Sequence, residues 1–209
     1  MKRKVKTKVK GFRTTDGAGV KLVRVLGNLT TKEFDPILML DSFDSINPDD
    51  YTAGFPMHPH RGIETISYVS RGKMVHRDSL GNEAGISDGE VQWMNSGSGI
   101  MHEEMVPAAE RLLGVQLWLN LPAKDKMSKP SYNSIKNEDI KEIEIEGGKI
   151  RLLAGKYGEH EGYKGDYLSM DYYDIHLNAD AEVTLTMEED DSVMVFTLLG
   201  DVYIDGEHI

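Results

Sequence analysis

Short stretches in which apolar and polar residues alternate recur along the first part of the chain, separated by turns that contain glycine. Alternation with period two places successive side chains on opposite faces of a strand. The predicted strands are 20–26, 36–43, 64–69, 73–77, 89–94 and 112–119. Many short strands joined by tight turns favour an all-β fold of the jelly-roll barrel type.

A polar stretch with a proline near each end, 121–130, predicts a linker after the last of these strands. Beyond the linker, apolar patterns predict further strands at 140–145, 149–153, 167–177, 181–187 and 192–199. We therefore expect two domains, residues 1–125 and 126–209. The second contains His160, His176 and His208 without a His-x-His pair, so we expect no metal site in it.

The first ten residues are basic, with six lysines and arginines and no acidic residue. The chain as a whole has 24 basic and 35 acidic residues, so the part after residue 10 has a net charge of −17. A basic segment could contact nucleic acid, but lysines alternate with apolar or β-branched residues over 4–10, which is typical of an edge strand. We predict that edge strand and no direct nucleic-acid binding, because the acidic remainder would repel phosphates.

The composition is that of a globular protein, with 39% hydrophobic residues and 21 glycines. The chain has no cysteine, which excludes a disulfide framework. No run approaches the roughly 20 apolar residues of a membrane-spanning helix, and the N-terminus lacks the apolar core of a signal peptide. We expect a cytoplasmic protein with no membrane partner.

Two histidine-containing stretches are candidates for a metal site. His58 and His60 are separated by one residue, so an extended strand would present both imidazoles on one face. In the second stretch, His102 and Glu104 share a face in the same way. Imidazole and carboxylate ligands suit iron, manganese, nickel, copper or zinc. Glu64 has the same parity as the histidine pair and is an alternative ligand.

The spacing of these motifs and of the surrounding glycines resembles the two-part signature of cupins. Four longer segments, 34–43, 54–68, 92–105 and 114–122, are similar to the pirin family, a branch with two cupin barrels. The similarity extends from about residue 5 to the end of the chain. It implies an all-β pirin-like bicupin with a complete N-terminal metal-binding cupin barrel and a truncated C-terminal barrel.

The resemblance to pirins also implies the ligands, which fall on His58, His60, His102 and Glu104. Glu64, a ligand in many other cupins, is not one in pirins. We therefore expect one divalent transition metal per chain, Fe(II) in the first place, and no organic cofactor. Three neutral imidazoles and one carboxylate would leave two positions of a six-coordinate ion open to substrate or dioxygen.

The same motifs supply apolar side chains that we expect either to line a pocket at the metal or to form plain barrel core: Phe55, Trp93, Met94, Ile100, Met101 and Met105. Arg61 lies between the histidine pair and Glu64. We expect it either to orient an anionic substrate or to pair with Glu64.

Two functions of different classes fit this site. Pirins are similar to flavonol dioxygenases such as quercetin 2,3-dioxygenase, which open a ring of an aromatic substrate with dioxygen and release carbon monoxide. In that reaction Glu104 would be both a ligand and the catalytic base for the substrate hydroxyl. The alternative is a non-catalytic, redox-sensitive regulatory protein that binds a transcription factor or a metabolic enzyme. A barrel that binds metal without activity is a third.

Residues 198–209 resemble the start of the first hairpin of the second pirin barrel, beyond which pirins continue. Residues 195–199 and 202–204 are apolar enough to require sheet partners. Burial of apolar area is worth roughly 25 cal/mol per Å², so a few hundred Å² left exposed would cost several kcal/mol. We therefore expect the second half to be partly disordered or to self-associate through these C-terminal strands.

Overall fold

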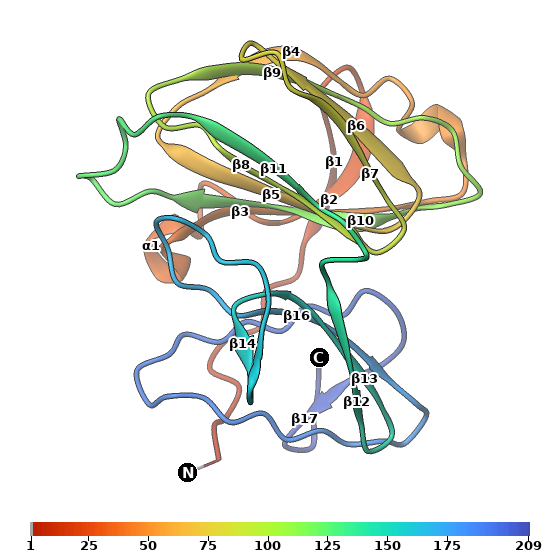
Figure 1. Ribbon diagram of the computed structural model, residues 1–209. Helices are drawn as coiled ribbons and strands as arrows, with labels where there is room; N and C mark the ends of the chain where they lie inside the picture. Colours follow the sequence, from red (N-terminus) through yellow and green to blue (C-terminus); the bar gives the residue numbers. More distant parts are fainter. Residues whose placement is uncertain (1) are drawn as a thin grey trace.

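The computed structural model describes residues 2–209, and almost all of its regular structure is β-sheet. Sheet A is antiparallel and has seven strands, here in spatial order: β1 (Phe12–Asp16), β2 (Val20–Leu26), β3 (Ile37–Ser45), β10 (Leu112–Asn120), β5 (Ile63–Arg71), β8 (Glu90–Asn95) and β11 (Ser131–Ile135). Sheet B has four: β4 (Phe55–His60), β9 (Ile100–Met105), β6 (Lys73–Asp78) and β7 (Glu83–Ser87). Together the two sheets form the jelly-roll barrel in the upper part of Figure 1.

The remaining elements are short. A one-turn helix, α1 (Thr31–Phe34), and a 3₁₀ turn at Pro48–Asp50 connect the early strands of the barrel. Sheet C contains β12 (Lys141–Ile145), β13 (Gly148–Ala154) and β16 (Tyr172–Leu177). Two small ladders pair β14 (Lys156–Tyr157) with β15 (His160–Glu161), and β17 (Tyr203–Ile204) with β18 (Glu207–His208). None of the helices between residues 2 and 209 is long and apolar enough to span a membrane.

The barrel interior has an apolar part and a polar part. Ten buried apolar residues pack together in the first: Val20, Leu22, Phe43, Tyr51, Phe55, Val69, Met74, Ile86, Val106 and Leu112. The second contains buried polar side chains of both sheets, among them Ser67, Gln92 and Gln116 of sheet A and His102 and Glu104 of sheet B. Buried polar groups are stable only when they are hydrogen-bonded or bind an ion, so the polar part is the place to look for function.

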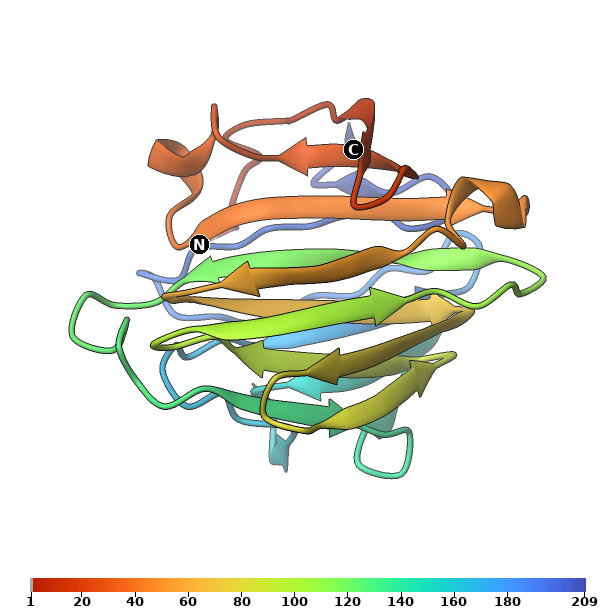
Figure 2. The same cartoon turned by 90° about the horizontal axis from the view of Figure 1, so that it is seen from above.

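The second half of the chain packs on the outer face of sheet A, as Figures 1 and 2 show. Strand alternation turns Ile66, Leu117 and their neighbours away from the barrel interior, where they meet Ile140, Leu153 and Ala154 in one buried cluster. Tyr163, Leu168, Tyr172, Phe196 and Leu198 complete this layer as partly buried residues. The barrel and the second half therefore share a core.

A buried arginine adds polar contacts between the two halves. The guanidinium of Arg151 in β13 donates to the carbonyl of Gly89 at 2.8 Å, to Asn137 Oδ1 at 2.6 Å and to Glu142 Oε1 at 2.9 Å. Its side chain is 8% exposed. The buried charge of Arg151 is tolerated because nearly all of its N–H groups have hydrogen-bond acceptors. These charge-assisted hydrogen bonds fix how sheet C packs on the barrel.

The six strands predicted before residue 121 are confirmed, with ends shifted by one or two residues at most positions. The predicted edge strand at 4–10 is wrong, because the edge of sheet A is taken by β1. The basic segment instead runs along the C-terminal residues, where Lys8 Nζ lies 2.9 Å from Glu207 and Arg3 donates to the carbonyls of Glu188 and Asp191. Alternation predicts an extended chain but does not supply a neighbouring strand.

Predictions in the second half are partly wrong. The strand expected at 167–177 is reduced to β16, and residues 181–187 and 192–199 have no assigned strand. Val195 and Leu199 are 46% and 60% exposed. Residues 202–204 find a partner inside the chain, because β17 pairs with β18. Self-association through the C-terminal segments stays a prediction.

Because one apolar cluster spans both halves, we predict that they unfold together. Leu117→Ala removes a side chain that is 4% exposed in this cluster and should lower the free energy of unfolding by about 2–5 kcal/mol. Leu80→Ala, at a residue 52% exposed, is the control and should change it by less than about 0.5 kcal/mol. Urea unfolding followed by tryptophan fluorescence and by far-ultraviolet circular dichroism should give coincident curves; two separated transitions would contradict a shared core.

Candidate metal centre

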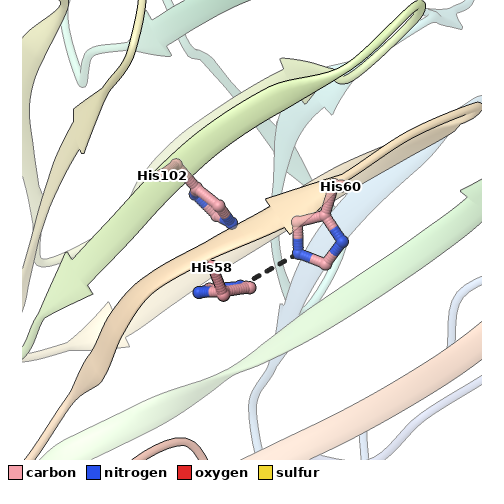
Figure 3. A group of neighbouring side chains, drawn as sticks. All are labelled: His58, His60 and His102. Atoms are coloured by element: carbon pink, nitrogen blue, oxygen red, sulfur yellow. Dashed lines mark hydrogen bonds between the residues drawn. The ribbon is translucent and has the colours of Figure 1, made fainter.

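Three histidines predicted as ligands come together inside the barrel. His58 and His60 lie on β4 and His102 on the neighbouring strand β9, and one ring nitrogen from each lies within 4.8 Å of the others. Figure 3 shows the three rings turned toward one another, with His58 Nε2 3.0 Å from His60 Nε2. His102 is 1% exposed. The cluster brings together residues 42 positions apart in sequence through a single strand pair.

The register of β4 and β9 produces this geometry. His58 is directly opposite His102, and His60 is opposite Ile100. Pro59 is accommodated because β4 is the edge strand of sheet B, where a missing N–H breaks no ladder hydrogen bond. The turns before β5 and β9 hold this register, since Gly62 N donates to Gly97 O at 2.8 Å. Gly97 has a φ of +41°, and a Cβ there would lie 2.1 Å from the carbonyl oxygen of Ser128.

The donor set fits a divalent transition metal. His58 Nδ1 donates to the carbonyl of Pro56 at 2.8 Å, which leaves its Nε2 as a lone-pair donor facing His60. Metal–imidazole bonds are about 2.1 Å long, so two nitrogens at right angles on one ion are about 3 Å apart, close to the 3.0 Å between His58 and His60. His102 Nε2 is buried and has no hydrogen-bond partner within residues 2–209. These three nitrogens are therefore suited to a common ion.

Glu104 lies beside the three histidines but is turned toward sheet A. Its carboxylate accepts hydrogen bonds from Gln92 Nε2 and from Gln116 Nε2, the latter 3.1 Å from Oε1 and 3.0 Å from Oε2, and Ser67 Oγ lies 3.4 Å from Oε1. The side chain is 1% exposed and lies outside the 4.8 Å group of nitrogens. Its role as a fourth ligand stays a prediction.

Glu64 does not face the histidines. The turn at Gly62, with a φ of +69°, interrupts the strand between His60 and Glu64, so the shared parity inferred from the sequence is lost. Glu64 is 1% exposed and lies on the outer face of sheet A. Burial, and to a smaller extent the negative charge of Asp166, raises the pKa of Glu64. Arg61 does not pair with it and donates to Met127 Sδ instead.

Several side chains expected around the metal lie elsewhere. Trp93 is part of the cluster between sheet A and the second half, and Phe55 is in the apolar part of the barrel. Met101 and Met105 are 39% and 41% exposed, because odd-numbered residues of β9 point out of the barrel. An aromatic residue outside this predicted set, Trp118 of β10, does contact the site, with its ring centroid 4.8 Å from that of His60.

A fourth histidine at the site, His76, is not among the residues predicted from the sequence. It lies on β6 and is fully buried, with Nδ1 3.3 Å from His102 Nδ1 and Nε2 2.9 Å from Asp78 Oδ2. Its ring stacks on Tyr132 with centroids 3.9 Å apart. The alternation of Met74, His76 and Asp78 in a predicted strand was the signal available, since it puts a His-x-Asp pair on one face.

Burial controls the protonation of the site. Burial, assisted by electrostatic repulsion from His58, lowers the pKa of His60 to about 4, and burial with three neighbouring histidines lowers the pKa of His102 to about 2. Burial raises the pKa of Glu104 against the opposing hydrogen bond from Gln116. For Asp78, burial would raise the pKa, but hydrogen bonds from His76 and from the Asn82 and Leu80 turn outweigh it and lower the pKa. His60 and His102 are therefore neutral near pH 7, the form that binds metals.

These shifts predict a pH dependence of the metal-free protein. Because the folded-state pKa values of His60 and His102 lie below 6.5, the unfolded chain binds more protons between about pH 6.5 and 4, and the free energy of unfolding falls as the pH is lowered through that window. In the double variant His60→Gln/His102→Gln this fall should shrink by about 1–3 kcal/mol. Urea unfolding in a chelator at pH 7 and pH 4.5 measures it; an identical pH dependence in both proteins would contradict the shifts.

Comparisons with known proteins identify related sequences and structures. Residues 19–119 match the family model named Pirin. A Pseudomonas aeruginosa protein provisionally named quercetin 2,3-dioxygenase is 42% identical over 204 residues, which cover 94% of this chain and 72% of that protein. Human pirin is 34% identical over 206 residues, or 97% of this chain and 69% of that protein.

Among solved structures, quercetin 2,3-dioxygenase from Acinetobacter baumannii superimposes with a TM-score of 0.68 at 30% identity. The match covers 79% of this chain and 61% of that structure, so this chain spans less than two thirds of its length. The sequence similarity, the barrel and the position of the three histidines lead to one assignment: the chain belongs to the pirin family.

Proposed function

We propose that this protein binds one divalent iron through His58, His60, His102 and Glu104 and catalyses ring cleavage of a flavonol-like substrate with dioxygen. The observation that carries the proposal is the cluster of three histidine nitrogens inside the barrel. The names of relatives from Pseudomonas aeruginosa and Thermoplasma acidophilum, both provisionally quercetin 2,3-dioxygenases, support the substrate class. A cytoplasmic location remains part of the same proposal.

Bound iron would supply a Lewis acid for the substrate hydroxyl and positions for dioxygen. The chain's own residues would do the rest. Glu104 would accept the hydroxyl proton, because its buried carboxylate lies beside the three histidines. Gln92 and Gln116 would hold that carboxylate in place, because both donate amide hydrogens to it. Trp118 would cover His60 and keep water from that side of the site.

Metal content tests the ligands. His60→Ala and His102→Ala should each abolish stoichiometric metal binding after chelator washing, because only two imidazoles and the Glu104 carboxylate, which Gln92 and Gln116 hold toward sheet A, would remain. His176→Ala is the matched control, since His176 lies on sheet C and pairs with Asp174, and should keep one metal per chain. Elemental analysis after chelator washing gives the stoichiometry, with circular dichroism to confirm the β-structure. Full metal content in both site variants would rule out the ligand assignment.

Oxygen uptake with quercetin tests the chemistry. Glu104→Gln should weaken metal binding and, at equal metal occupancy, lower the turnover by about 10²-fold or more, because it removes the base. Glu64→Gln is the control, since Glu64 faces away from the site, and should retain both properties. No flavonol-dependent uptake by protein with one bound iron per chain would refute the enzyme and favour a regulatory protein that binds a protein partner.

A further inference from the structure

We propose that Asp78, acting through His76, fixes the tautomer in which His102 presents Nε2 to a metal. His76 and Asp78 would thus be positioning residues, neither ligands nor catalytic groups. The effect on metal affinity rests on the metal site of the proposed function. The tautomer of His102 is a property of the metal-free protein, so the tautomer relay and the metal site can be tested separately.

The chain of contacts begins at a carboxylate whose two oxygens have different partners. Asp78 Oδ1 accepts from the backbone N–H of Leu80 at 2.9 Å and of Asn82 at 3.1 Å, which closes the turn after β6. Asp78 Oδ2 accepts from Asn82 Nδ2 at 2.8 Å and faces His76 Nε2 at 2.9 Å. The side chains of His76 and Asp78 are both 0% exposed. A carboxylate can only accept, so His76 Nε2 must carry a proton.

The proton on His76 Nε2 determines which nitrogen of His102 is protonated. We take His76 to be neutral, with its lone pair on Nδ1, which lies 3.3 Å from His102 Nδ1. His102 satisfies that acceptor by carrying its own proton on Nδ1, and its Nε2, buried and unpartnered, is left as the lone-pair donor. Metal-binding histidines commonly donate their other N–H to a carboxylate or carbonyl. Here a second histidine relays that role from Asp78.

A purely structural role for His76 is the competing explanation. Its ring stacks on Tyr132 at an interplanar angle of 10° and fills the space between β6 and β11. Stacking on Tyr132 requires an aromatic ring at position 76, whichever nitrogen carries the proton. The relay requires a group that donates to Asp78 and accepts from His102. Variants that keep one property and lose the other separate the two explanations.

Asp78→Asn is the decisive variant. The oxygen of the new amide should stay at the Oδ1 position, because two backbone N–H groups donate there, which turns its NH₂ group toward His76 Nε2. His76 would then accept at Nε2, carry its proton on Nδ1 and donate to His102 Nδ1. His102 would be protonated on Nε2, the atom that the metal requires. The two backbone hydrogen bonds of the turn and the shape of the core stay the same, and the Asn82 amide, which donates Nδ2 to Oδ2 in the wild type, turns over to present its oxygen to the new NH₂ group.

Ring nitrogen chemical shifts from long-range ¹H–¹⁵N correlation spectra of metal-free protein at pH 8 report the tautomers directly. We expect His102 to be protonated on Nδ1 in the wild type and on Nε2 in Asp78→Asn. Co(II) affinity, measured by chelator competition, should fall by about 10- to 100-fold in Asp78→Asn. His76→Phe, which keeps the stack, should show the same loss, and His76→Gln, which can donate to Asp78 and accept from His102, should recover most of it.

His176→Phe is the control, since His176 also pairs with an aspartate but lies outside the barrel, and its Co(II) affinity should be unchanged. A His102 protonated on Nε2 in the wild type, or the same tautomer in Asp78→Asn and wild type, overturns the relay. Equal Co(II) affinities in His76→Phe and wild type would show that His76 only packs. If the wild type binds no Co(II) while the tautomer switches as expected, the relay stands and the metal site fails.

Discussion

The pairing of β4 with β9 is the interaction on which the site depends. It sets His58 opposite His102, so two proposed ligands from distant parts of the sequence meet as a cross-strand pair, and the alternation of β4 adds His60 on the same face. A shift of the register by one residue would point His102 out of the barrel and replace it with the exposed Met101. The glycines in the adjoining turns, with Ser96 bonded to Ile63, hold the register against such a shift.

Sheet A separates two environments. Its inner face carries Ser67, Gln92 and Gln116, which hold Glu104 near the histidines, and its outer face carries the apolar residues that bind the second half. Side chains alternate along each strand, so neighbouring residues of one strand point to opposite faces of the sheet. The polar residues of the candidate site lie on the inner face, and the apolar residues that stabilise the fold lie on the outer face. The second half contributes to the site directly through Tyr132 of β11, which stacks on His76, and indirectly by packing on the sheet that carries the partners of Glu104.

Much of this could be predicted from the sequence, and the errors have physical causes. Strands of the barrel follow from alternation, and the three histidines follow from parity within single strands. Glu64 was placed on the histidine face because parity was carried across Gly62, where a positive φ interrupts the strand. His76 was missed because its contact with His102 depends on how β6 pairs with β9. The predictions of strands at 4–10 and 192–199 are wrong, because alternation of apolar and polar residues does not show whether a neighbouring strand is there to pair with.

In the proposed site, a single metal ion is held where the three histidine nitrogens converge. Anomalous diffraction at the absorption edge of iron, from crystals of iron-loaded protein, locates that ion directly. We expect one peak per chain within about 2.1–2.3 Å of a ring nitrogen of each of His58, His60 and His102. A metal-loaded crystal without a peak inside the barrel, or with its peak at His160, His176 or His208, would contradict the site.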